Sequence, residues 1–148
     1  SAASDVYKRQ VKRLFEACRR NQLEFLLEVI PSKAGETDDM TTALVIQRFY
    51  DESIFPDWWK LEPLLTAAAW RHVIDAIERN DAHTRGIVIL GLGESEEKLA
   101  QSFSIAATYP LVKGFAVGRT IFADVAQQWF LGKKTDAKAI DEMAKNYQ

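Results

Sequence analysis

Short apolar runs alternate with amphipathic segments along the whole chain. Each apolar run has the length of a β-strand and is followed by residues whose apolar members recur at helical spacing. No hairpin-type turn joins two runs. This order predicts an α/β fold in which a parallel sheet is connected by right-handed crossovers. The expected strands are residues 23–30, 58–61, 86–90 and 111–117, and the expected helices are residues 11–22, 41–55, 66–80, 95–109, 121–131 and 136–147, with a break around Gly132.

The expected strand ends recur at a regular spacing. Equivalent points along the chain are 32, 31 and 27 residues apart. A (β/α)8 barrel of about 250 residues has about 31 residues in each unit. Open doubly wound sheets have units of similar length, so spacing alone leaves both folds open. We expect the C-terminal half of a TIM (β/α)8 barrel, with four parallel strands alternating with helices. The equivalent points are Glu28, Lys60, Gly91 and Gly118.

Composition and charge exclude several classes of protein. The chain has 148 residues, of which 47% are hydrophobic, and its 19 basic residues are balanced by 21 acidic ones. We therefore expect no nucleic-acid partner and no membrane partner. A single cysteine, Cys18, and the lack of a secretory segment favour the cytoplasm. Because neither Cys18 nor the isolated His72 and His83 has partners at metal-ligand spacing, we expect no metal and no cofactor.

The first ten residues do not join smoothly to the rest of the chain. Residues 5–10 resemble the in-frame translation of a sequencing-library adapter, so we set residues 1–10 aside as an artefact. Residues 11–148 are then a partial barrel domain, and the natural protein is expected to continue upstream. Half a barrel leaves the strands at Leu23 and Leu111 as unpaired edges. We expect the isolated chain to be inactive and to form homo-oligomers.

Lys60 is the first candidate for chemistry, because parallel α/β folds place their sites at the carboxyl ends of strands. It lies in an apolar strand between Trp59 and Leu61. Partial desolvation there would lower the pKa of its amine and favour attack on a carbonyl group. Alternatively, Lys60 forms a structural ion pair with Glu62, two residues on and so on the same face of the strand.

Two charged residues near the preceding strand end are further candidates. Burial of Glu28 at the end of an apolar strand would raise its pKa and suit it to move protons to and from a substrate hydroxyl. Glu28 could equally be the counter-ion of Lys60 on the neighbouring strand. Lys33 lies in a polar loop, where it is either a solvated charge or a contact to a substrate phosphate.

Two turns that contain glycine are candidates for binding phosphate. Gly91 and Gly93 separate a strand from a helix that Ser95 can cap, so free backbone N–H groups could hold an anion there. Glycines in such a turn can equally serve its geometry alone. Gly118 precedes Arg119, whose guanidinium can bind two phosphate oxygens. In a complete barrel these turns would follow strands 7 and 8, the usual phosphate site of that fold.

Three segments carry a resemblance to a known family: WKLEP at residues 59–63, GIVILG at 86–91 and KGFAVGRTIF at 113–122. From about Val11 onward, the chain resembles the uncharacterised domain that follows the sugar kinase in many bacterial 5-dehydro-2-deoxygluconokinases of myo-inositol catabolism. More distantly it is similar to class I tagatose-bisphosphate aldolases, whose Schiff-base lysine lies in a Lys-x-Glu-x-Pro strand. Here Pro63 is one residue closer to Lys60 than in that pattern.

The resemblance implies a lyase that cleaves 2-deoxy-5-keto-gluconate 6-phosphate into dihydroxyacetone phosphate and malonate semialdehyde. It assigns the Schiff base to Lys60 and proton transfer to Glu28, and it assigns phosphate binding to Gly91, Gly118 and Arg119. The implied partners are a phosphorylated sugar acid and a fused upstream kinase domain. The alternative is a non-catalytic domain of that kinase that binds phosphosugar or promotes oligomerisation.

Overall fold

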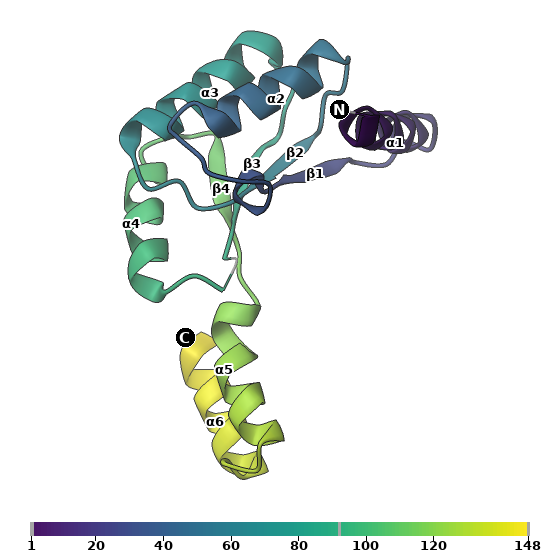
Figure 1. Cartoon of the computed structure of the whole chain (residues 1–148). Coiled ribbons are helices and arrows are strands. Elements are labelled where there is room, and N and C mark those ends of the chain that lie inside the picture. Colours follow the sequence, from purple (N-terminus) through teal and green to yellow (C-terminus); the bar gives the residue numbers. More distant parts are fainter. Residues whose placement is uncertain (1, 92, 148) are drawn as a thin grey trace.

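Four parallel strands form a single sheet in the order β1-β2-β3-β4 (Figure 1). The computed structural model describes residues 2–91 and 93–147, and it describes side chains throughout these ranges except at residues 2, 3 and 119–121. Among the described residues, no helix is both long enough and apolar enough to cross a bilayer. The elements are α1 (Ala2–Arg20), β1 (Leu26–Val29), the 3₁₀ turn η1 (Pro31–Lys33), α2 (Thr41–Asp51), β2 (Trp58–Leu61), α3 (Ala67–Asn80), β3 (Gly86–Leu90), α4 (Glu96–Ala106), β4 (Val112–Ala116), α5 (Arg119–Phe130) and α6 (Asp136–Tyr147).

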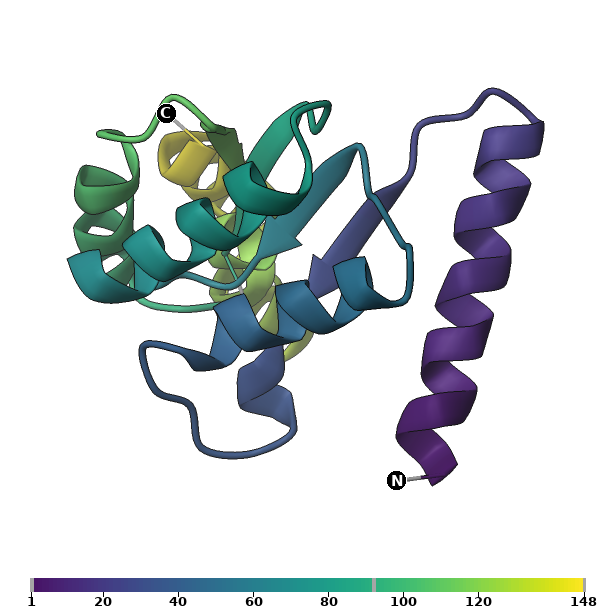
Figure 2. The same ribbon diagram turned by 90° about the horizontal axis from the view of Figure 1, so that it is seen from above.

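The order of the strands distinguishes between the two candidate folds. A doubly wound sheet reverses its strand order at a switch point and carries helices on both faces. Here the strands follow their sequence order without reversal. The connecting helices α2 and α3 lie side by side over one face (Figures 1 and 2), and α4 packs into the same core through Phe103 and Ala106. The α/β fold is confirmed, and its arrangement is that of half a (β/α)8 barrel; that it is the C-terminal half stays a prediction.

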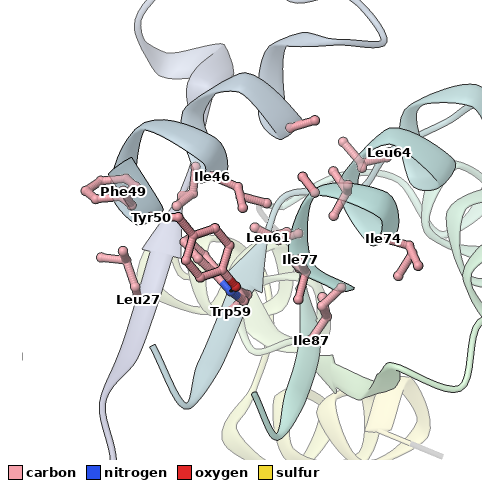
Figure 3. Close-up of a cluster of buried hydrophobic side chains, with 14 of the residues drawn as sticks. Leu27, Ile46, Phe49, Tyr50, Trp59, Leu61, Leu64, Ile74, Ile77 and Ile87 are labelled. Carbon is pink, nitrogen blue, oxygen red and sulfur yellow. Dashed lines mark hydrogen bonds between the residues drawn. The ribbon is translucent and has the colours of Figure 1, made fainter. Parts of the chain in front are cut away.

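Alternate strand residues point toward the helices and form the core (Figure 3). Trp59 is fully buried, and its indole N–H donates to the hydroxyl of Tyr50 on α2 at 3.0 Å. Burial raises the pKa of the Tyr50 phenol, so the group stays neutral and accepts this bond. The core thus joins the sheet to its helices through both packing and a buried hydrogen bond. The strand residues on this face are Leu27, Val29, Trp59, Leu61, Ile87 and Ile89.

The other set of strand residues forms the opposite face of the sheet, which we call the inner face. In a closed barrel this set points into the barrel interior. In the part of the chain that the structure describes, this face is partly open: Leu26, for example, keeps 48% of its surface exposed. The inner face consists of Leu26 and Glu28 on β1, Trp58 and Lys60 on β2, Val88 and Leu90 on β3, and Gly114 and Ala116 on β4.

Strand β1 is shorter than expected. It begins at Leu26 and not at residue 23, because the backbone before it bonds to a side chain. The N–H of Phe25 donates to the carboxylate of Asp57 at 2.7 Å, and its carbonyl accepts the N–H of Asp57 at 2.9 Å. This reciprocal contact fixes the entry of β1 beside the entry of β2.

Two helix ends show how local backbone geometry sets element boundaries. Helix α2 stops at Asp51, four residues earlier than expected, because Ser53 adopts a φ of 59° and the N–H of Ile54 bonds back to the carbonyl of Phe49 at 3.0 Å. The expected break at Gly132 is confirmed, since this residue has a φ of 68° between α5 and α6.

Helix α1 includes residues 2–10, which we expected to be an artefact. It runs without interruption from Ala2 to Arg20, so residues 2–10 form one helix with those that follow. Tyr7 packs edge-on against Phe49, with 6.5 Å between ring centroids, and Lys8 pairs with Glu52 at 3.7 Å. The adapter origin of residues 1–10 stays a prediction, but Tyr7 and Lys8 take part in the packing of this structure.

The two outer strands and the C-terminal helices leave apolar and hydrogen-bonding surface uncovered. Among the described strands, β1 and β4 each pair with a single neighbour. The α5–α6 hairpin projects from the end of β4 on the side of the sheet away from α2 and α3 (Figures 1 and 2). Unpaired strand edges and contiguous apolar side chains are sites of association. The large exposed side chains of the hairpin are Phe122, Trp129, Phe130, Leu131, Ile140 and Tyr147.

We therefore predict that the purified chain associates at micromolar concentration. Light scattering coupled to size-exclusion chromatography is expected to give a mass of at least two chains. Replacing the 78%-exposed Phe130 with serine should shift the distribution toward smaller species, whereas replacing the exposed Lys138 with serine should not. A uniform monomer at all accessible concentrations would contradict this prediction.

Candidate functional site

A hollow of about 400 Å³ opens on the inner face, at the carboxyl ends of the strands. Parallel α/β folds carry their chemistry at this edge of the sheet. The polar side chains that line it are Glu28, Lys33 and Lys60, and Gly118 lines it from the turn after β4. The remaining lining is apolar and comes from Ile30, Leu90, Ala116, Val117 and Phe122. Three charged groups thus share a hollow with apolar walls.

Lys60 and Glu28 form an ion pair in this hollow. The two residues are register partners on adjacent strands, so their side chains leave the sheet on the same face. The Nζ of Lys60 lies 3.0 Å from Oε1 of Glu28. Of the two explanations for Glu28, the structure therefore shows the counter-ion arrangement. This arrangement also places a carboxylate directly beside the amine that we expected to attack a carbonyl.

The burial expected for this pair is only partly present. The Lys60 side chain is 25% exposed and that of Glu28 is 43% exposed. The expectation that Glu28 is buried is wrong for this chain. The physical reason is that the inner face, which a closed barrel would shield from water, is open here.

Glu62 is not the partner of Lys60, so the alternative pairing of these two residues is wrong. Glu62 lies just beyond the end of β2 and is buried, with 7% of its surface exposed. Its carboxylate accepts the backbone N–H of Ser32 at 3.2 Å and also accepts the Ser32 hydroxyl. Glu62 thus binds the η1 turn that follows β1.

Two backbone N–H groups of the turn after β3, those of Gly91 and Glu94, donate to carbonyl groups of the fold. The N–H of Gly91 donates to the carbonyl of Ala116 at 3.2 Å, and that of Glu94 donates to the carbonyl of Gly91 at 3.0 Å. Gly93 has a φ of 71°, a conformation that favours glycine. Neither glycine lines the hollow that holds Lys60. The structure thus supplies the geometric explanation for Gly93, and phosphate binding by Gly91 and Gly93 stays a prediction.

The helix after this turn is capped as expected. The Ser95 hydroxyl accepts the N–H of Lys98 at 3.4 Å, and Glu96 and Glu97 occupy the first turn of α4. Glu94 lies beside the cap and pairs with Lys98 at 3.1 Å. This concentration of carboxylates makes the amino end of α4 less favourable for a bound anion than the sequence alone suggested.

The turn after β4 lies in the hollow. Gly118 is the N-cap residue of α5, and its carbonyl accepts the N–H of Phe122 at 3.3 Å. The amino end of a twelve-residue helix therefore begins at the wall of the hollow, where its dipole favours an anion. Arg119 is the first residue of α5, but its side chain lies outside the described residues.

Lys33, which we expected to be either a solvated charge or a contact to a substrate phosphate, also lines the hollow. It lies in η1, four residues beyond Val29 at the end of β1, and it lines the hollow beside the strand ends. Its sequence position at a strand end was the available signal. No group of three or more His, Cys, Asp or Glu side chains suited to a metal ion occurs among residues 2–91 and 93–147.

A comparison with protein families identifies the family of the chain. The sequence model of a family described as "Uncharacterized protein conserved in bacteria (DUF2090)" matches residues 3–148. The chain belongs to the DUF2090 family. The match extends through all of the strands and includes Glu28, Lys60 and Gly118. No curated protein matches the chain. The DUF2090 description names no activity, so any function must be argued from the hollow itself.

Proposed function

We propose that this DUF2090 protein is a class I aldolase-type domain of carbohydrate catabolism, which is active when its barrel is complete. The observation that carries the proposal is the contact between an amine and a carboxylate, Lys60 and Glu28, at 3.0 Å in a hollow at the carboxyl ends of parallel strands. An amine that can form a Schiff base and an adjacent group that can move protons are what this reaction needs. The proposed substrate is the one the resemblance implies, 2-deoxy-5-keto-gluconate 6-phosphate.

The proposed reaction begins with attack of the neutral Lys60 amine on the C5 ketone, which loses water to form an iminium ion. Glu28 takes the proton of the C3 hydroxyl, and the C3–C4 bond breaks as its electron pair flows into the iminium. Malonate semialdehyde leaves, with C3 as its aldehyde carbon. The remaining enamine takes a proton at C4, and hydrolysis releases dihydroxyacetone phosphate and the free amine.

The phosphate is assigned to the β4 side of the hollow. Gly118 and the amino end of α5 offer backbone N–H groups and a favourable dipole there. In this proposal the Arg119 guanidinium adds a bidentate contact. The apolar lining from Leu90, Val117 and Phe122 would exclude water from the reacting carbons.

Replacing Glu28 with glutamine is expected to lower kcat by about 10²–10⁴-fold while the Lys60 adduct still forms, because proton transfer is lost but the nucleophile is not. The measurement is steady-state cleavage together with mass spectrometry after borohydride treatment, in a protein that contains the complete barrel. Glu24→Gln is the matched control, since Glu24 lies before the same strand and pairs with Arg85 at 2.9 Å. Wild-type kcat in the Glu28 variant would contradict the assigned role.

One observation favours a second candidate function. The charge of Lys60 is paired with that of Glu28 at 3.0 Å. A purely structural ion pair has the same geometry. In that case the domain binds phosphosugar, or joins chains, for a fused cytoplasmic kinase without catalysing cleavage. Lys60→Met separates the candidates, because a binding domain keeps its affinity for sugar phosphate and an aldolase loses turnover.

A further inference from the structure

The hollow contains a second amine that the proposed reaction does not use. Lys33 lines it together with Lys60 and Glu28, so the three charges sum to one positive charge. Lys60 is paired with Glu28 at 3.0 Å, whereas Lys33 forms no ion pair with any of the residues that the structure describes. A free ammonium group at the wall of a partly apolar hollow attracts an anionic group of a ligand.

The backbone beside Lys33 is held by a contact from the residue that follows β2. Ser32, the residue before it, is held by the buried carboxylate of Glu62 through both its backbone N–H and its hydroxyl. Hydrogen bonds to an ionised acceptor are stronger than those between neutral groups. A turn held at two points by a buried charge positions the following side chain more closely than a free loop would. The η1 turn therefore holds Lys33 toward the hollow.

The order of the strands then orders the groups along the hollow. Lys33 and Glu28 belong to the β1 side, Lys60 to β2 and Gly118 to the β4 side. Neighbouring strands are about 4.8 Å apart, so the β1 and β4 sides are separated by about 14 Å. The amine that would bind the carbonyl thus lies between an amine at one end and a helix amino terminus at the other. A substrate with an anionic group at each end and a ketone between them fits this order.

We propose that Lys33 binds the carboxylate of the sugar acid, and that Glu62 is a positioning residue that acts on Lys33 through Ser32. This inference rests on the proposed aldolase function. The substrate lies across the strand ends with its carboxylate at β1 and its phosphate at β4. After cleavage, the fragment that carries the carboxylate is malonate semialdehyde, so Lys33 selects the aldehyde partner of the reaction and has no role toward dihydroxyacetone phosphate.

The test uses the synthesis direction in a protein with the complete barrel. Dihydroxyacetone phosphate is condensed with malonate semialdehyde or with propionaldehyde, an aldehyde of the same carbon number without the carboxylate. Lys33→Gln is expected to lower kcat/KM for malonate semialdehyde by about 10–100-fold, mainly through KM, and to leave propionaldehyde within about twofold. Lys33→Arg should restore most of the loss, and Lys138→Gln, an exposed lysine on α6, should change neither aldehyde.

The positioning role of Glu62 is tested by the same measurement, the preference for malonate semialdehyde over propionaldehyde. Ser32→Ala and Glu62→Gln should each lower the preference for malonate semialdehyde over propionaldehyde, by less than Lys33→Gln does. A residue that only stabilises the fold would affect both aldehydes alike. Equal loss with both aldehydes, or no loss in Lys33→Gln, overturns the assignment of Lys33.

A binding measurement separates this inference from the proposed function. Calorimetry with 3-hydroxypropionate, an unreactive analogue that keeps the carboxylate, needs no turnover. If the wild-type protein condenses neither aldehyde, the aldolase proposal fails, and the binding result then decides on Lys33. Weaker binding in Lys33→Gln than in wild type supports a carboxylate site, and unchanged binding rejects it.

Discussion

Replacing Lys60 with methionine is expected to abolish cleavage of 2-deoxy-5-keto-gluconate 6-phosphate, with a fall in kcat of at least about 10³-fold. Methionine has a similar length but no amine, so the iminium cannot form. The measurement is mass spectrometry of a protein with the complete barrel after borohydride treatment with substrate. In the wild type we expect one adduct of substrate or product mass on Lys60, and in the variant none.

The matched control for this experiment is Lys98→Met. Lys98 pairs with Glu94 outside the hollow that holds Lys60, so its loss should leave both the adduct and turnover unchanged. Cleavage that continues at the wild-type rate in Lys60→Met would rule out the Schiff-base mechanism. Loss of turnover with no wild-type adduct at any lysine would instead indicate another chemistry at the same hollow.

The largest effect on stability is expected for Trp59→Ala. Trp59 is fully buried between the sheet and α2, where it packs against Phe49 and Tyr50 and donates a hydrogen bond to the Tyr50 hydroxyl. Removing a buried aromatic side chain costs about 3–5 kcal/mol, a large part of the stability of an ordinary domain. Chemical denaturation followed by circular dichroism should show the midpoint shifted to much lower denaturant or no cooperative transition at all.

Trp58 provides a control on the same strand. It is the preceding residue and the same amino acid, but it lies on the inner face, is only half-buried and donates its indole N–H to Glu24 at 2.8 Å. Trp58→Ala should therefore cost clearly less stability than Trp59→Ala. An equal loss would mean that the inner face is covered in solution, which contradicts the open half-barrel as the state of this chain.

The sheet was largely predictable from sequence because its signal is local. Strand-length apolar runs, each followed by a segment with helical spacing and with no hairpin turn between runs, indicated parallel strands in succession. The structure confirms this pattern and adds the register that brings Lys60 to Glu28. That pairing was one of two stated alternatives, because spacing along a strand cannot reveal which carboxylate on a neighbouring strand is closer.

The parts that could not be predicted depend on contacts between distant residues. The hydrogen bond between Glu62 and Ser32 joins residues 30 positions apart, and no feature of the sequence at either position predicts it. The same holds for Asp57, whose carboxylate accepts the backbone N–H of Phe25, so that β1 begins later in the sequence than expected. The turn after β3 resembles a phosphate-binding turn in sequence, and no feature of the sequence indicates that the N–H of Gly91 donates to the carbonyl of Ala116 on β4.

The pairing of β1 with β2 has a consequence for how such a site could diversify. Lys60 and Glu28, the pair proposed to react, are held by two strands, whereas the groups proposed to bind the two ends of the substrate lie in the turns after β1 and β4. Substitutions in those turns could alter which sugar acid binds and the length of its carbon chain. Backbone hydrogen bonds between β1 and β2 would keep the amine of Lys60 beside the carboxylate of Glu28. Bacterial relatives with the same strands but different turns would then share one reaction and differ in substrate.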